Sequence, residues 1–215
     1  RLDQAFTELM PALILQDAAA AGRLAAQVAD AELRQDVLRL VARLWSAKDP
    51  AAAAAWAAAL PADVEHDTAL SEIASEVAST DAPRAVQLYA LYARSAELSP
   101  TLETLAHQWA DQNFGAALTW TLARPPSAQR ESLLARLAFV QARTDPRAAA
   151  TLATTHLAPG ERQDEAVIAV LHQWAQLDPS AAASWVAAFP AGPLRDRAST
   201  ELAGVSAYRV TRRPP

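Results

Sequence analysis

The chain has 215 residues, a net charge of −5, 52% hydrophobic and 20% charged residues, and no cysteine. This length predicts one or two domains with a real core, and the composition excludes a disordered chain. The acidic balance, with Lys48 the single lysine, argues against a nucleic-acid or anionic-membrane partner. The absence of cysteine excludes disulfides, thiol catalysis and cysteine-ligated zinc.

The longest apolar run covers residues 51–60 and is too short to cross a bilayer, so we expect no transmembrane segment. The first residue is Arg1, and we therefore expect the native N-terminus and any signal peptide to lie outside this sequence. The localisation therefore stays open between the cytoplasm and the cell envelope.

A repeat of 32 residues runs through the chain. Its marker is an acidic residue, replaced once by asparagine, and the six marker residues are Asp17, Asp49, Asp81, Asn113, Asp145 and Asp178. Four residues after each marker stands an alanine, namely Ala21, Ala53, Ala85, Ala117, Ala149 and Ala182. Apolar residues recur seven residues after the markers and four, eight and eleven residues before them. Such self-similarity is typical of a repeat architecture.

The spacing predicts the helices in chain order. A first half-repeat at residues 1–15 is helical, and each marker then acts as the N-cap of a short helix of about 11 residues, since its side chain accepts free backbone N–H groups. Proline follows the marker at positions 50, 146 and 179, where a helix needs no N–H. A brief Pro- or Gly-containing loop then leads to a longer helix of about 15 residues. No strand is expected.

We therefore expect an all-α fold, a right-handed α-solenoid of about six 32-residue αα-hairpins that form 64-residue double repeats. The domain would cover residues 1–204, with the half-repeat at 1–15, six repeats at 16–204, and a C-terminal cap or tail at 205–215. Beyond Gly204 the pattern fades, because the next marker position holds Val210.

Tryptophan marks alternate repeats. The second, fourth and sixth markers have a tryptophan four residues before and seven residues after them, while Leu, Val or Gln stands there in the others. We interpret the six tryptophans as core residues in which bulky pairs fill the space left by slimmer neighbours.

The Asp-Pro followed by Trp56 resembles the junction between tetratricopeptide repeats, although the Leu, Gly and Tyr of that family are replaced by Ala59, Leu60 and Asp63. A closer likeness is to the Trp-Ala-x-x-Asp-Pro-x-Ala-Ala-x-x-Trp repeats of uncharacterised bacterial proteins, which residues 174–185 match at every specified position. The likeness covers about residues 13–203. It implies a bacterial α-solenoid, similar to tetratricopeptide and HEAT folds, and brings no known activity.

Few residues are candidates for chemistry. His107 and His172 share a His-Gln-Trp-Ala context, and we interpret both as helix-surface or core-edge residues, while His156 would end a short helix. His66 lies in the acidic stretch 63–67, which we predict to be a solvated loop with Asp67 or Thr68 capping the next helix. A hard-cation site there is the alternative.

Glu131-Ser132 resembles the catalytic pair of lytic transglycosylases, some of which carry an alanine-rich α-superhelix, but the Gly-Leu-Met-Gln stretch that should follow is missing. Glu161, Asp164 and Glu165 would open a helix, where negative charge favours the dipole. No nucleophile, base and orienting group recur together, so we expect no enzyme, no cofactor and no metal site.

The variable positions two, three and six residues after each marker should face away from the core. They carry the candidate partner-binding residues Arg23, Arg84, Gln87, Thr119, Arg147, Thr151 and Ser184. Our first hypothesis is a non-catalytic interaction module or scaffold that holds a peptide or protein partner in a concave helical groove.

The alternative is a structural spacer or a segment of a longer protein that self-associates through exposed solenoid ends. An accessory domain of a cell-wall enzyme is a distant third. Spacing leaves open whether Tyr89 and Tyr92 belong to the core or extend the groove.

Overall fold

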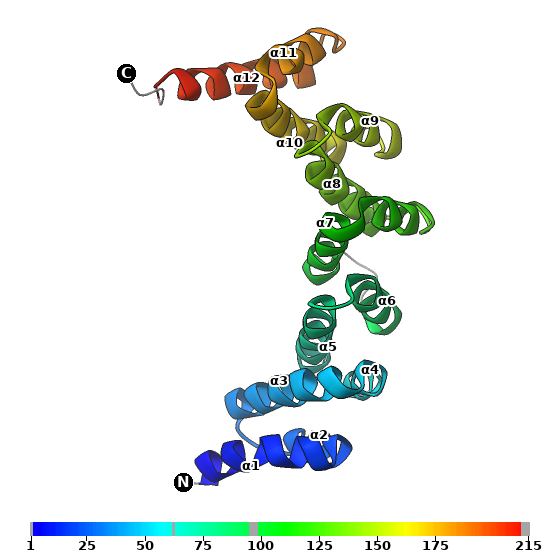
Figure 1. Ribbon diagram of the computed structural model, residues 1–215, viewed down its shortest axis with the longest axis vertical. Coiled ribbons are helices and arrows are strands. Elements are labelled where there is room, and N and C mark those ends of the chain that lie inside the picture. The colour runs from blue at the N-terminus through cyan, green and yellow to red at the C-terminus, as the bar shows by residue number, and fades with distance from the viewer. Residues whose placement is uncertain (1, 62, 95–98, 212–215) are drawn as a thin grey trace. The chain divides into compact units, whose positions relative to one another are not determined.

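The computed structural model describes residues 2–61, 63–94 and 99–211, with only the backbone described at residues 2–8, 63 and 206–211. Throughout these ranges the secondary structure is α-helical, without a strand, which confirms the all-α fold (Figure 1). The helices are α1 (Leu2–Gln16), α2 (Ala18–Ala25), α3 (Ala31–Lys48), α4 (Pro50–Ala58), α5 (Asp63–Ala78), α6 (Ala82–Tyr92), α7 (Pro100–Leu122), α8 (Ala128–Ala142), α9 (Pro146–His156), α10 (Glu161–Leu177), α11 (Pro179–Ala187) and α12 (Pro193–Thr211).

The markers cap the short helices as expected. In each of the six, the side chain accepts a hydrogen bond from the backbone N–H three residues later, over 2.9–3.1 Å. Asn113 has φ −151° and ψ 84°, close to the −144° and 88° of Asp49, so it kinks α7 into a long helix and a short one. Asn113 is thus an N-cap with the same geometry as the aspartates, because either side chain offers an acceptor oxygen.

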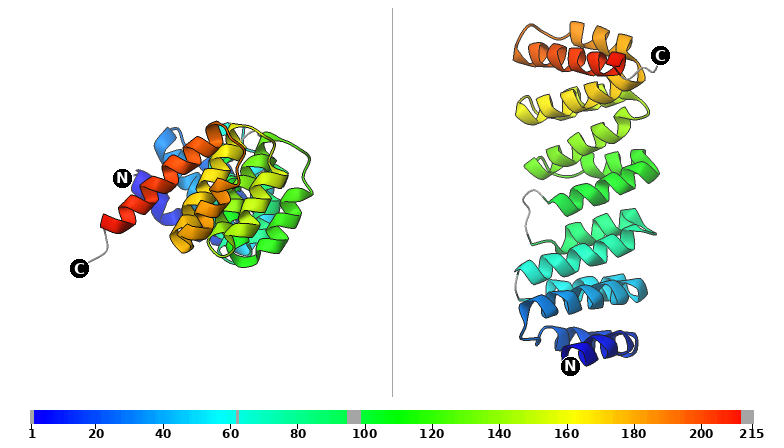
Figure 2. Two further views of the ribbon diagram at one scale, coloured as in Figure 1. Left: turned by 90° about the horizontal axis from the view of Figure 1, so that it is seen from above. Right: turned by 90° about the vertical axis from the view of Figure 1, so that its left-hand side faces the viewer.

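Contacts divide the chain into two compact units, Arg1–Trp109 and Ala110–Pro215. In the N-terminal unit α3 packs against α1 and α5, and the short helices α2, α4 and α6 lie against these long helices. In the C-terminal unit α10 packs against α8 and α12, with α9 and α11 beside them. Within each unit, successive hairpins therefore lie next to each other in chain order (Figures 1 and 2).

The core consists of the recurring small and apolar positions. The alanines four residues after the caps are at most 1% exposed, and the residue eight positions after each cap is buried as well. Tyr89 stands eight residues after its cap and belongs to the core rather than to the groove, since it is 6% exposed. Its hydroxyl accepts a hydrogen bond from the Ser99 hydroxyl at 2.9 Å. Tyr92 is half-buried.

One predicted core position is exposed in the first helix. Leu9 is 68% exposed, whereas the equivalent residues eight positions before the other caps, such as Val41 and Ile73, are at most 2% exposed. The reason is the place of α1, which has α2 and α3 as packing neighbours but follows no other helix among the described residues.

The tryptophans are less uniformly buried than predicted. Trp109 and Trp174 are core residues at 5% and 6% exposure, while the other four are half-buried. Trp45 and Trp56 pair with ring centroids 5.7 Å apart, and Trp174 and Trp185 pair at 5.2 Å. Each pair joins a long helix to the short helix that follows it, and in both pairs the ring on the short helix is half-buried.

Ion pairs join neighbouring long helices, and the repeat pattern does not reveal them. Arg34 Nε lies 2.6 Å from Glu65 Oε1, and Arg143 Nη1 lies 3.0 Å from Asp111 Oδ1. Arg197 makes two hydrogen bonds to Glu165, of 2.6 and 3.1 Å. Each pair spans about one repeat. Arg34 and Glu65 are half-buried, whereas the other two pairs are exposed and solvent weakens their attraction.

The expected boundary at residue 204 is not an element boundary, because α12 runs without a break from Pro193 to Thr211. Ser206 and Tyr208 of the expected tail lie in this helix, with side chains that are not described, and residues 212–215 lie outside the described residues. Among the helices that the structure describes, none is both long enough and apolar enough to span a membrane.

Candidate functional site

The seven candidate binding residues all lie on short helices and are all exposed. In the N-terminal unit Arg23 stands on α2, and Arg84 and Gln87 stand one turn apart on α6. In the C-terminal unit Arg147 and Thr151 stand one turn apart on α9, while Thr119 and Ser184 stand on the short part of α7 and on α11. Since the fourth and eighth residues after each cap are buried, every short helix has one buried and one exposed face.

The three hydroxyls of this set bond back to their own helices. Thr119 donates to the Gly115 carbonyl at 2.8 Å, Thr151 to Arg147 at 3.1 Å and Ser184 to Ser180 at 3.0 Å. Their donors are thus engaged, and the hydroxyl oxygens face solvent as acceptors. The charged members of the set supply the donors for a partner.

Two arginines lie over tryptophan rings in the C-terminal unit. The Arg147 guanidinium carbon is 5.9 Å from the centroid of Trp174, and that of Arg124 is 4.6 Å from Trp120. A cation over an aromatic face is attracted by the ring quadrupole. The core tryptophan of the following long helix therefore helps to hold the Arg147 charge on the exposed face of α9.

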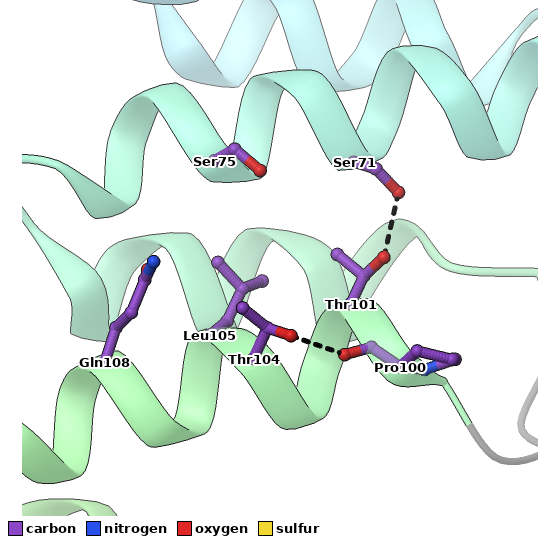
Figure 3. A pocket seen from close by; sticks show the side chains of 7 residues that line it. All are labelled: Ser71, Ser75, Pro100, Thr101, Thr104, Leu105 and Gln108. Atoms are coloured by element: carbon purple, nitrogen blue, oxygen red, sulfur yellow. Dashed lines mark hydrogen bonds between the residues drawn. The ribbon is translucent and has the colours of Figure 1, made fainter.

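A polar hollow of about 280 Å³ opens between α5 and the first part of α7 in the N-terminal unit (Figure 3). It is lined by Ser71, Ser75, Pro100, Thr101, Thr104, Leu105 and Gln108. The Ser71 and Thr101 hydroxyls lie 3.1 Å apart across it, and Thr104 donates to the Pro100 carbonyl at 3.0 Å. No lining side chain is ionisable, so this hollow offers hydrogen bonds and no proton-transfer group.

Two serines line the hollow at positions that hold larger side chains before the second and sixth caps. Ser71 and Ser75 stand ten and six residues before their cap, Asp81. The same positions hold Arg39 and Arg43 before Asp49, and Ile168 and His172 before Asp178. The repeat pattern contains this signal, but it becomes visible only when the variable positions of the long helices are compared.

A second hollow, of about 480 Å³, lies in the C-terminal unit between the end of α8 and the middle of α7. Phe114 and Gln141 line it together with the Asp111–Arg143 ion pair. Gln141 stands where Trp109 and Trp174 stand in the neighbouring bulky repeats, so a slim side chain leaves this space open.

The prediction of a solvated loop around His66 is wrong. Residues 63–67 form the first turns of α5, and His66 is fully buried. Its Nδ1 lies 2.9 Å from Asp67 Oδ1, and its Nε2 lies 3.1 Å from the Tyr92 carbonyl oxygen at the end of α6. The His66 side chain links the start of α5 to the end of α6. Because α5 begins at Asp63, Asp67 and Thr68 lie inside the helix and neither is its N-cap.

The other histidines lie on helices. His107 is half-buried on α7, and His156 ends α9 as predicted. His172 on α10 is half-buried, with Nε2 3.1 Å from Glu201 Oε2. Among the described residues no group of three or more His, Cys, Asp or Glu side chains could hold a metal ion.

The acidic candidates open helices as expected. Glu131 lies in the first turn of α8, whose N-cap is Ser127, and Glu161 and Asp164 lie in the first turn of α10. Glu165 binds Arg197, and this hydrogen bond holds the pKa of the carboxyl below its ordinary value of 4.5. Its charge is therefore used in an ion pair between α10 and α12.

No protein-family model matches this chain, and no curated protein or solved structure matches it either.

Proposed function

We propose that the chain is a non-catalytic protein–protein interaction module, built as a right-handed α-solenoid of six 32-residue hairpin repeats similar to the tetratricopeptide type. Its short helices present their exposed faces to a peptide or protein partner. The sequential packing of hairpins within each unit supports the solenoid architecture, since such hairpins bury their apolar faces against their neighbours.

The observation that carries this proposal is that each short helix has one buried and one exposed face. The buried face has alanine at the fourth residue after every cap, whereas the exposed face varies from repeat to repeat and holds the charged and amide donors. A recurring small residue on the buried face serves packing, and a variable polar face on a rigid scaffold serves recognition.

Arg84 and Arg147 define the chemistry of the partner. Both are exposed, one in each unit, and Arg147 is held over Trp174. Guanidinium groups prefer carboxylates because their donors match the two carboxylate oxygens. We therefore propose that the partner segment is acidic.

The test is a double charge reversal, Arg84→Glu with Arg147→Glu, measured against acidic peptides selected from a random library on the native chain. We expect an affinity loss of at least about tenfold, which corresponds to about 1.4 kcal/mol. The matched control is Arg43→Glu with Arg195→Glu, which changes the net charge equally at exposed positions of the long helices α3 and α12, again one in each unit. Equal losses in both variants would show that net charge alone matters and would remove the short-helix assignment.

Exposure of Leu9 favours a second candidate function, self-association through the N-terminal face. Leu24, seven residues after the first cap, is 43% exposed on the same hairpin, and both positions are more covered in the other repeats. Light scattering across a concentration series would then show oligomers that Leu9→Glu dissociates. Leu91→Glu is the control, because Leu91 is 72% exposed at a position that is exposed in every repeat. A monomer at all concentrations would reject this function.

A further inference from the structure

The hollow between the end of α8 and the middle of α7 lies inside the C-terminal unit, near the caps Asn113 and Asp145. Its volume of about 480 Å³ falls in the range of small-molecule pockets, about 300–1,000 Å³. Repeats precede and follow it in the chain, so the hollow is an internal feature of the repeated sequence.

The floor of the hollow is apolar and its rim is polar. Ala110 and Val140 are 4% and 7% exposed, and the half-buried Phe114 lines the hollow with them. At the rim the Arg143 guanidinium pairs with Asp111 over 3.0 Å, and both side chains are exposed. Ligand pockets have this composition, with an apolar lining and a few polar groups that orient the ligand.

Phe114 gives the hollow an aromatic wall that the other repeats lack at this position. It directly follows its cap, whereas the other five caps are followed by alanine or proline. The residue lies at the start of the short part of α7 and is half-buried. Its ring offers a face and an edge to a second aromatic ring, and aromatic pairs prefer offset-stacked or edge-to-face contacts.

The pair Gly115 and Gln141 indicates what the hollow accepts. These residues stand two after one cap and four before the next, where the following repeat has Arg147 and Trp174. There the guanidinium carbon of the arginine lies 5.9 Å from the centroid of the indole ring. Gly115 has no side chain, and a Cβ added to it would meet only Asn113 Oδ1, at 3.9 Å. One side of the hollow thus corresponds to the place of an indole ring in the next repeat.

The Gln141 side chain is available to a ligand. It is half-buried and makes no hydrogen bond to any residue that the structure describes. Its amide oxygen accepts and its amide nitrogen donates. The Arg143 guanidinium adds a cation, which is attracted to the face of an aromatic ring and most strongly to indole. Arg124 and Arg147 lie over tryptophan rings of the same unit in this way.

We propose that this hollow binds the indole side chain of a tryptophan in a partner polypeptide. The ring occupies the apolar floor beside Phe114, its N–H donates to the Gln141 amide oxygen, and the Arg143 guanidinium covers its outer face. The polar rim then faces the peptide groups on either side of the tryptophan, which free indole lacks. None of the seven candidate residues on the short helices lines the hollow, so this site is additional to the proposed function.

The probe is N-acetyl-tryptophanamide, which carries the indole ring between two peptide groups. It is titrated into the full chain with labelled valine methyl and glutamine amide groups, and NMR shifts are recorded. We expect saturable shift changes at Val140 and Gln141. N-acetyl-leucinamide, which is apolar but not aromatic, should bind at least about fivefold more weakly, because it lacks the ring contacts with Phe114 and Arg143. Free indole should also bind more weakly, because it lacks the peptide groups.

Gln141→Trp is the decisive variant, because an indole of the chain itself then fills the hollow and the saturable shifts at Val140 should disappear. The matched control is Gln176→Trp, the same substitution at an exposed position of α10 outside the hollow, which should leave the affinity unchanged. Phe114→Leu keeps an apolar side chain without the ring and should weaken binding about fivefold. Circular dichroism shows whether each variant is folded, and Phe114→Leu provides the test if Gln141→Trp is not.

Three outcomes would overturn the proposal, namely no saturable shift up to the solubility limit of the probe, equal affinity for N-acetyl-leucinamide, and undiminished binding by the folded variants. Free indole that binds as tightly as N-acetyl-tryptophanamide would overturn the assignment to a polypeptide. The charge-reversal test of the proposed function is independent of these outcomes, because neither Arg84 nor Arg147 lines the hollow.

Discussion

Gly22 on α2 lies directly against the indole of Trp56 on α4. A Cβ added to Gly22 would be 2.5 Å from Trp56 Nε1 and 2.9 Å from Cε2, distances at which one group must move. Trp56 has little freedom to do so, because its ring is also paired with Trp45 at 5.7 Å. At this junction a bulky residue of one repeat packs over the smallest residue of the repeat before it.

Gly22→Ala should therefore destabilise the chain although alanine favours a helix. Overpacking costs about 1–3 kcal/mol, while the gain in helix propensity is about 1 kcal/mol. We expect a net loss of about 1 kcal/mol in the free energy of unfolding, measured by denaturant titration.

The control for this prediction is Gly204→Ala on α12. Gly204 is exposed, and an added Cβ meets nothing within 4 Å, so only the propensity gain of about 1 kcal/mol acts. A stabilised Gly22→Ala variant would contradict the packing account, since both substitutions would then behave as free helix positions.

The alanines four residues after the caps offer a test of crowding within one helix. Ala53 is fully buried on α4, and Ala55, two residues later, is exposed. Ala53→Leu should lower the free energy of unfolding by about 1–3 kcal/mol because the added methylenes have no space. Ala55→Leu should change it by less than about 0.5 kcal/mol, as exposed substitutions usually do. Similar losses in the two variants would refute the assignment of a crowded contact.

The helices could be predicted from sequence because the caps act locally. An aspartate or asparagine side chain needs only the backbone of the next turn, so its spacing is visible in the letters alone. His66 shows the limit of this reasoning. The acidic stretch around it has the composition of a loop, but burial of His66 and its bond to the distant Tyr92 carbonyl belong to a helix, and that contact depends on packing.

For the candidate binding residues and the hollows, too, only part could be predicted from the sequence. The exposed positions of the short helices follow from periodicity, and all seven residues are exposed. The two hollows could not be predicted from periodicity. Each depends on a side chain that is smaller than the residue at the equivalent position of other repeats. Ser71 and Ser75 open one hollow by being small between two long helices, and Gln141 opens another by standing in a tryptophan position.

Asn113 gives a prediction about the kink in α7. Asn113→Asp keeps the acceptor for the Ala116 N–H, so we expect the free energy of unfolding to change by no more than about 0.5 kcal/mol. Asn113→Ala removes the cap and should cost about 0.5–2 kcal/mol. Denaturant titration of both variants measures the difference. Equal stabilities would mean that packing alone holds the kink and that the cap bond contributes nothing.

His66→Leu tests the buried tie between α5 and α6. The substitution leaves the Tyr92 carbonyl without its His66 partner, and we expect a loss of about 1–3 kcal/mol, the usual cost of an unsatisfied buried group. His156→Leu, at the exposed end of α9, is the control and should change stability little. If His66→Leu is as stable as the native chain, the hydrogen bonds of the imidazole do not stabilise the fold.

The Glu165–Arg197 pair makes stability depend on acid pH. The bond from Arg197 holds the folded-state pKa of Glu165 below its ordinary value of 4.5, so the folded chain binds fewer protons here than the unfolded chain in the range between the two values. The contribution of this pair is present above pH 4.5 and is lost as the pH falls through the lower folded-state pKa. Because both side chains are exposed, salt should weaken the effect. The measurement is an NMR titration of the Glu165 carboxyl carbon. In Arg197→Gln its pKa should return toward 4.5, and an unchanged titration in that variant would show that another group lowers it.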